Sequence, residues 1–102
     1  MVTVTQLTGA LQHMMTRPDC TSAIIKDGCA MASAWNLISV CVRPCDIGDA
    51  EKLLKSGAIP VTGVVSFPHG SGDTAIKVAE AQKAIDDGAK ELMMVYNVGR
   101  LL

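Results

Sequence analysis

The chain has 102 residues, which is enough for one domain with a modest hydrophobic core. Apolar residues make up 49% of it and aromatic residues only 3%, so that core must be built from aliphatic side chains, Cys and Met. The net charge is −1 and the basic residues are scattered, which argues against nucleic acid as a partner. No apolar run approaches the roughly 18–20 residues of a membrane span, and the first nine residues lack a signal-peptide pattern.

The cysteine and histidine pattern points to no metal site, and we expect no cofactor. Cys41 and Cys45 are four positions apart, which is not a usual zinc spacing, and His13 and His69 are isolated. Cys29 falls in a helical pattern and Cys41 in a strand pattern, so both are expected to be buried thiols. Reduced thiols suit a cytoplasmic protein, which is the expected location.

The first predicted strand is Leu11–Met15, and Pro18 stands in the polar turn that follows. Thr21 can then cap a helix that Asn36 ends. The apolar face predicted for this helix consists of Ile24, Ile25, Gly28, Cys29, Ala32 and Trp35.

The second unit begins with Ile38–Val42, a continuous β-branched run of the kind found in buried parallel strands. Asp46 can cap the next helix, and Gly57 ends it. The predicted buried face of that helix comprises Ile47, Ala50, Leu53 and Leu54.

The third predicted strand is Val61–Phe67, where Gly63 suits a close approach of a neighbouring side chain. Asp73 or Thr74 caps a helix that Gly88 ends, and Glu80 with Lys83 is assigned to its exposed side. Its predicted inward residues are Ala75, Val78, Ala79, Gln82 and Ile85. The run Glu91–Gly99 is predicted to be a fourth, buried strand that opens into a loop.

The pattern β-α-β-α-β-α-β predicts a parallel sheet. Strand starts fall near residues 11, 37, 61 and 91. Two architectures fit this order: an open doubly wound sheet and half of an eight-stranded barrel. No G-x-G-x-x-G follows a strand and the glycine loop at 70–72 lacks Walker spacing, so nucleotide binding is not indicated.

Several segments resemble the deoxyribose-phosphate aldolase family in order and spacing. They are Ser39–Pro44, Phe67–Gly70, Ile76–Ala81, Asp87–Leu92 and Val95–Gly99. The resemblance covers residues 10–102, with residues 1–9 as a lead-in to a single half-barrel domain. It implies a TIM barrel, a fold of roughly 250 residues, of which this chain would supply the first four strands.

The resemblance implies Schiff-base aldol chemistry, in which a lysine amine attacks a sugar-phosphate carbonyl. In the family that lysine lies on later strands. No lysine here falls in a strand pattern, and we expect all six to be surface charges. The resemblance therefore favours a truncated or engineered aldolase-like half that is catalytically impaired. The alternative is an assembled oligomer that acts as a lyase on 2-deoxyribose 5-phosphate or a related aldehyde.

The resemblance also marks pocket positions. On the first strand the family has Asp, then His or Leu, then Thr, where this chain has Gln12, His13 and Met14. On the fourth strand Met93 replaces a family Asp that assists proton transfer. Cys41 retains the family's pocket cysteine, and Cys41 with Asn97 is expected to contact substrate. Gln12, Met14, Cys41 and Met93 are the candidate site residues.

The replaced positions allow two interpretations. Methionine is a common core filler, so Met14, Met15, Met93 and Met94 can simply occupy space. Alternatively, they line an apolar pocket of a small-molecule binding scaffold.

A half barrel leaves two strand edges unpaired and one sheet face uncovered. Self-association into a homodimer, or a higher oligomer, would rebuild eight strands. Element swapping and collapse to a flavodoxin-like open sheet are the alternatives. Small-molecule aldehydes or sugar phosphates are the other expected partners.

Overall fold

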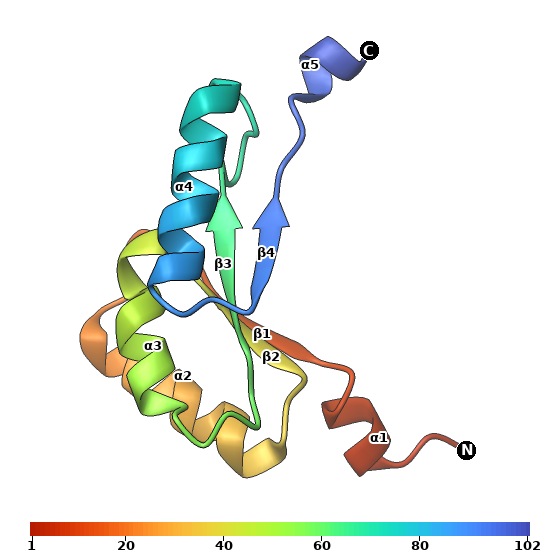
Figure 1. The fold of residues 1–102 in the computed structure, drawn as a ribbon. Coiled ribbons are helices and arrows are strands. Elements are labelled where there is room, and N and C mark those ends of the chain that lie inside the picture. The colour runs from red at the N-terminus through yellow and green to blue at the C-terminus, as the bar shows by residue number, and fades with distance from the viewer.

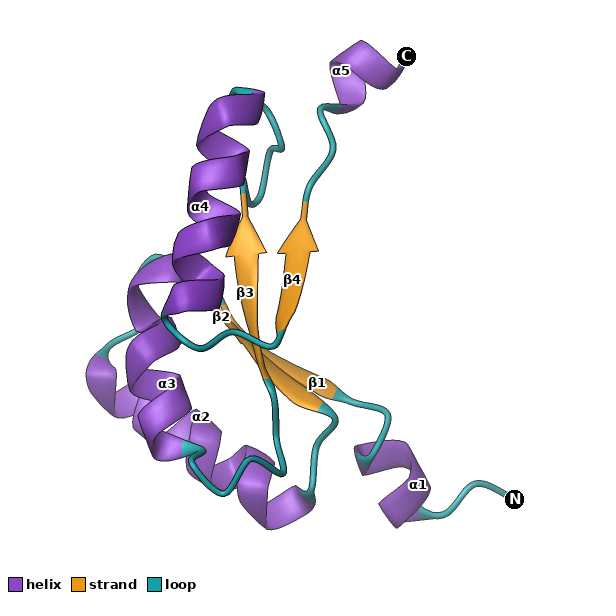
Figure 2. Ribbon diagram, viewed as in Figure 1, coloured by secondary structure: helices purple, strands orange, loops and turns teal.

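The structure is a computed structural model that describes residues 1–102. It consists of one parallel sheet with three long helices on one side and a short helix at each end of the chain (Figures 1 and 2). In chain order the elements are α1 (Val4–Thr8), β1 (Gln12–Met15), α2 (Ser22–Trp35), β2 (Ser39–Val42), the 3-10 turn η1 (Pro44–Asp46), α3 (Ile47–Leu53), β3 (Val61–Val65), α4 (Thr74–Asp86), β4 (Glu91–Met94) and α5 (Val98–Leu101). No helix is long and apolar enough to cross a membrane.

The strand order decides between the two expected architectures. The strands follow one another as β1-β2-β3-β4, and every neighbouring pair is parallel. A doubly wound sheet reverses its strand order at a switch point and carries helices on both faces. Here the order never reverses, and α2, α3 and α4 all lie on the same face (Figure 2). The arrangement is that of half a β/α barrel.

The core lies between the sheet and its helices, and we call this face of the sheet the helix side. Side chains alternate between the two faces of a strand, so every second residue of each strand points to the helices. Fourteen buried residues form one cluster there, with Val40 and Val42 of β2, Val61 of β3 and Ile47 of α3 among them. The predicted burial of Cys29 is confirmed, and this residue belongs to the cluster.

Two glycines allow the close packing of helices on the sheet. A Cβ atom on Gly63 would lie 2.7 Å from Ile47 Cδ1 and 3.3 Å from Ala84 Cβ, which confirms the close approach expected at this position. A Cβ on Gly28 of α2 would overlap with Met15 Sδ, so α2 rests directly on β1. Both glycines therefore face the helix–sheet interface.

The ends of α2 lie where the sequence predicted them, whereas the ends of α3 differ from the prediction. The Thr21 hydroxyl accepts a hydrogen bond from the Ile24 amide, and Asn36 ends α2 in the left-handed conformation with φ 51°. Asp46 precedes α3 as expected but makes no capping bond, because its carboxylate accepts from Arg43 Nε at 2.6 Å. The helix also stops at Leu53, before the predicted stop at Gly57.

The predicted inward faces of the helices are partly wrong. Ile24 and Trp35 of α2 and Leu53 of α3 are exposed, because they lie at the margins of the buried faces, whose centres are occupied by residues such as Ile25 and Ile47. The error is larger in α4, where Val78 and Ile85 are more than half exposed and Ala84 is the one fully buried residue. Small Ala84 fits over Gly63, and this contact sets the rotation of α4.

That rotation also moves a residue that the sequence assigned to solvent. Glu80 turns toward the sheet, and its Oε1 accepts from the Ser66 amide at 3.4 Å. The large apolar residues of α4, Ile76, Val78 and Ile85, are left exposed.

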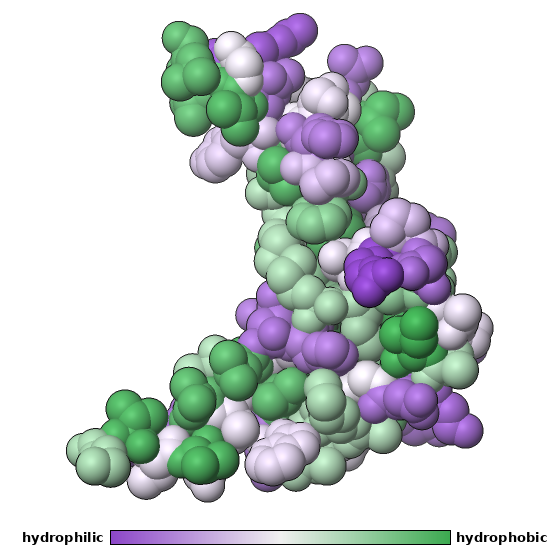
Figure 3. Space-filling view, turned by 180° about the vertical axis from the view of Figure 1, so that it is seen from behind, coloured by the Kyte–Doolittle hydropathy of each residue, from purple (hydrophilic) through white to green (hydrophobic).

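The ends of the chain also differ from expectation. The fourth strand is not buried: of its four residues only Met93 is half-buried, because no element covers its outer edge. Residues 98–101 form the helical turn α5 instead of a loop, and the lead-in contains α1. Seen from behind, the molecule is hollowed between apolar residues at its two ends (Figure 3).

Candidate functional site: the open face of the sheet

The face of the sheet that carries no helix collects most of the candidate residues, and we call it the open face. The register pairs Met14 with Cys41, Cys41 with Thr62, and Thr62 with Glu91. Gly63 points to the helices, so its neighbours Thr62 and Val64 point the other way. By the same alternation, the open face consists of Gln12, Met14, Ser39, Cys41, Thr62, Val64, Glu91 and Met93.

A chain of hydrogen bonds crosses all four strands on this face. Gln12 Nε2 donates to Ser39 Oγ at 2.7 Å and to Thr62 Oγ1 at 3.1 Å. Thr62 Oγ1 in turn donates to Glu91 Oε1 at 3.1 Å. The Gln12 amide is the donor in its bonds to both Ser39 and Thr62. The Thr62 hydroxyl accepts from Gln12 and can therefore use its own proton to donate to Glu91. The network therefore fixes Glu91 as an acceptor at one end and leaves no buried side-chain polar atom unpaired.

The buried Cys41 lies inside this network. It has no exposed surface, and burial raises the pKa of its thiol above 9.0, with the charge of Glu91 raising it further. A thiol reacts as its thiolate, so this environment makes Cys41 a poor nucleophile. The predicted burial is confirmed, and the residue is placed to line the face as a small neutral side chain.

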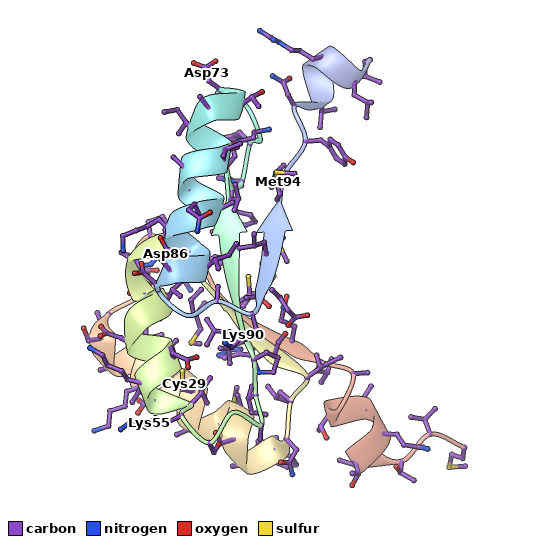
Figure 4. All side chains as sticks on the ribbon, in the orientation of Figure 1. Cys29, Lys55, Asp73, Asp86, Lys90 and Met94 are labelled. Carbon is purple, nitrogen blue, oxygen red and sulfur yellow. The ribbon has the colours of Figure 1, made fainter.

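The four methionines do not share one pocket. Met14 and Met93 lie on the open face, whereas Met15 is buried against α2 and Met94 points to the helix side, where it is exposed at the sheet edge (Figure 4). No cavity is lined by both Met14 and Met93. The apolar pocket that one of the two interpretations required is not among the cavities of the structure, because alternation in a strand sends neighbouring residues to opposite faces.

The structure keeps Asn97 apart from the other candidates. Asn97 lies beyond β4, and its Oδ1 accepts from the Arg100 amide at 3.1 Å as the cap of α5. It lines a polar cavity of about 130 Å³ together with Lys77 and Arg100, and no open-face residue contributes to that cavity.

Neither histidine is placed for catalysis on the open face. The His13 ring faces Gly28 of α2, on the helix side. His69 is exposed in the loop after β3.

No lysine reaches the open face. All six lie on helices or in connecting segments: Lys26, Lys52, Lys55, Lys77, Lys83 and Lys90. Figure 4 shows Lys55 beyond the end of α3 and Lys90 just before β4. The amine of Lys77 is committed to the backbone carbonyl of Val95 at 2.9 Å.

Arg43 is a structural residue that the sequence did not reveal. Its guanidinium donates to the carbonyls of Pro18 at 3.1 Å and Cys20 at 2.9 Å, and to the carboxylate of Asp46. The hydrogen bond to Asp46 raises the pKa of Arg43. The residue thus ties the loop after β1 to the loop after β2, a contact between segments too distant in sequence for local patterns to suggest.

Comparison with known proteins identifies relatives of this half barrel. No protein-family model matches the chain. The deoxyribose-phosphate aldolase of Treponema denticola is 40% identical over 97 residues, covering 95% of this chain and 45% of that protein. The aldolase of Carboxydothermus hydrogenoformans is 39% identical over 101 residues, with 99% and 44% covered. The chain belongs to the deoxyribose-phosphate aldolase family.

Solved structures of the family agree with the fold. A structure from Coccidioides immitis, assigned to the same enzyme, matches with a TM-score of 0.94 at 33% identity, covering 98% of this chain and 40% of that one. The aldolase of Aeropyrum pernix, described as tetrameric, matches with a TM-score of 0.91 at 20% identity, which supports the fold alone. The family's TIM barrel and the observed strand order make residues 1–102 half of a (β/α)8 barrel. The chain spans about half the length of the curated relatives that it matches.

Proposed function

We propose that residues 1–102 form one wall of a deoxyribose-phosphate aldolase-type pocket and do not supply its reacting amine. Taken alone, this half barrel is catalytically inactive. It presents hydroxyl, amide and carboxylate groups to a sugar phosphate or related aldehyde, and the carbonyl-attacking lysine belongs to the other half of the barrel.

The observation that carries this proposal is the composition of the open face. Schiff-base formation requires a lysine amine directed into the pocket, with its pKa lowered by a dry site or by a neighbouring cation. The open face carries one carboxylate, on Glu91, and no amine. Its remaining polar groups are the neutral side chains of Gln12, Ser39, Thr62 and Cys41.

Self-association is the alternative route to activity. The tetrameric aldolase of Aeropyrum pernix supports oligomer formation in the family. Two copies of this chain, joined as a homodimer, would restore eight strands. Activity of such a dimer would still require one of the six lysines to reach the pocket.

Reductive trapping tests the proposal. The chain is incubated with acetaldehyde and borohydride, and the adducts are located by intact mass and peptide mapping. We expect slow labelling spread over the exposed lysines in proportion to their accessibility. Lys77→Arg serves as a control, because the Lys77 amine is bound to the carbonyl of Val95, the residue that follows β4. A single adduct that forms stoichiometrically on one lysine would overturn the proposal.

A further inference from the structure

We propose that the polar cavity between the start of α4 and the helical turn α5 binds a phosphate group. The start of α4 and α5 lie at the same end of the molecule, beyond the carboxyl-terminal ends of β3 and β4 (Figure 1). No open-face residue lines this cavity. A phosphate group held here would therefore occupy a site separate from the proposed substrate wall, and its binding requires nothing of that wall.

The lining of the cavity is polar throughout. The cavity has a volume of about 130 Å³ and is lined by loop residues 71–73, by Thr74 and Lys77 of α4, and by Asn97 and Arg100 of the segment around α5. None of these residues is hydrophobic, and they come from two segments that only the fold brings together. Such a space suits a small polar group better than an apolar molecule.

Lys77 and Arg100 make the cavity basic. Neither side chain takes part in the three ion pairs of the structure. The Lys77 amine gives one hydrogen bond, to the Val95 carbonyl at 2.9 Å, which leaves two of its three protons free to donate. The Arg100 guanidinium has no partner in the chain, since only the backbone amide of Arg100 is bonded, to Asn97. Its planar fork of donors matches two oxygens of a phosphate.

The neutral groups of the lining add further donors. Because Asn97 Oδ1 accepts from the Arg100 amide at 3.1 Å, the side-chain NH2 of Asn97 is left to donate. Ser71 and Thr74 contribute hydroxyls, which can also donate. The first-turn amides of α4 receive no side-chain cap. A helix start by itself attracts anions only modestly, so the two cations are the main source of attraction.

Asp73 is the one carboxylate at the cavity. It caps no amide of α4 and pairs with neither cation. Figure 4 shows Asp73 above the start of α4, where it is exposed. Two cations and one carboxylate leave the lining with a net charge of +1. This balance favours an anion over a metal ion.

The two walls of the cavity are held together by the chain itself. A Cβ on Gly70, whose φ is 70°, would overlap with the Tyr96 carbonyl, so the loop after β3 packs directly on the segment after β4. Ser66 Oγ accepts from the Gly72 amide at 3.2 Å and fixes the loop, and the bond from α4 to the Val95 carbonyl adds a second tie. Binding would therefore cost little ordering of the backbone, which favours affinity.

Titration of the chain with inorganic phosphate tests the proposal, with amide signals followed by NMR at constant ionic strength. We expect saturable shifts confined to residues 71–77 and 97–100. Lys77→Gln and Arg100→Gln should each weaken binding about tenfold, the effect of losing one charge-assisted hydrogen bond. Lys83→Gln is the matched control, because it removes a cation from the same helix outside the cavity and should leave the affinity unchanged.

Asp73→Asn tests the sign of the charge effect. It removes the one carboxylate at the cavity and should tighten phosphate binding about threefold. If Lys77→Gln disturbs the fold by releasing Val95, Arg100→Gln still decides, because the Arg100 side chain bonds to nothing in the chain. An absence of shifts at the cavity, or equal weakening by Lys83→Gln, would overturn the proposal.

Two further titrations distinguish the sources of the phosphate group. 2-Deoxyribose 5-phosphate and unphosphorylated 2-deoxyribose are compared with inorganic phosphate under the same conditions. An ester that binds at least as tightly as inorganic phosphate would identify a phosphorylated small molecule as the ligand, and an ester that binds more weakly would identify free phosphate. Shifts at the cavity with 2-deoxyribose alone would contradict recognition through the phosphate group.

Discussion

The two faces of the sheet differ in what packs against them and in how their polar groups are paired. On the helix side, residues from all three long helices enclose the alternate side chains of the strands, and the core closes within the chain. On the open face, the polar groups bind one another through the Gln12–Thr62–Glu91 network, and both edges remain unpaired. The first face is covered by helices of this chain, whereas no helix covers the second.

This difference separates the residues that stabilise the fold from those that are candidates for function. Burial on the helix side supplies the free energy of folding, as in any α/β layer. On the open face Cys41, Thr62 and Val64 are buried as well, but they lie outside the main core cluster and no helix packs on them. Substitutions on the two faces should therefore have effects of different size and kind.

Ile47→Ala should have the largest effect on stability. Ile47 is fully buried and contacts the Gly63 notch, so truncation leaves a cavity in the core. We expect the free energy of unfolding to fall by about 3 kcal/mol. Ile76→Ala is the control, because Ile76 is 60% exposed on α4. Urea titration that gave equal losses for the two would contradict a core confined to the helix side.

Two glycines should respond with opposite signs. A Cβ on Gly28 would meet Met15 Sδ and the His13 ring, so Gly28→Ala should destabilise the fold by about 2 kcal/mol. A Cβ on Gly48 of α3 meets nothing within 4 Å, so Gly48→Ala should stabilise it by about 0.5–1 kcal/mol through helix propensity. Thermal unfolding of both variants measures the difference. Unchanged stability of Gly28→Ala would contradict the expected clash and would mean that the Met15 and His13 side chains move aside.

Thr62→Val tests the open-face network. The variant keeps the side-chain shape but removes the hydroxyl that links Gln12 to Glu91. We expect a loss of about 1 kcal/mol, since Gln12 keeps Ser39 and Glu91 remains in water. Thr5→Val, on the exposed helix α1, is the matched control. Losses of several kcal/mol for Thr62→Val would show that the open face is part of the folding core.

The raised pKa of Cys41 predicts a small alkaline effect. Burial favours the neutral thiol, so the contribution of Cys41 to stability is complete below the unfolded value near pH 9.0 and is lost as pH rises through the higher folded pKa. Cys41→Ala should therefore flatten the fall in unfolding free energy above pH 9. Cys45→Ala is the control, because Cys45 is exposed. Parallel profiles for all three proteins would contradict the buried location of Cys41.

Much of the fold follows from local patterns. The β-branched run before Arg43, the Thr21 cap and Asn36 with its left-handed backbone placed the second strand and the first long helix correctly. The rotation of α4 about its axis could not be predicted from local patterns, because it depends on the fit of Ala84 over Gly63, a contact between segments distant in sequence. Exposure of β4 was missed because its composition is that of a buried strand, whereas its surroundings in this chain are open.

The candidate site was predicted in part. Alternation along each strand brings Gln12, Met14, Cys41 and Met93 to one face, as the resemblance implied. The sequence did not predict that Gln12 is linked to Thr62 and, through it, to Glu91. Once the register of the strands is known, their positions on the same face of the sheet follow from it. Asn97 was grouped with Cys41 by resemblance, but it lines a separate cavity beyond the end of β4.

Hydrogen exchange tests the contrast between the two faces most directly. In the dilute chain we expect the backbone amides of the inner strands β2 and β3 to be protected, whereas amides of the edge strands β1 and β4 exchange quickly. Equal protection of all four strands in the dilute chain would contradict the claim that the helix side is complete and the open face is not.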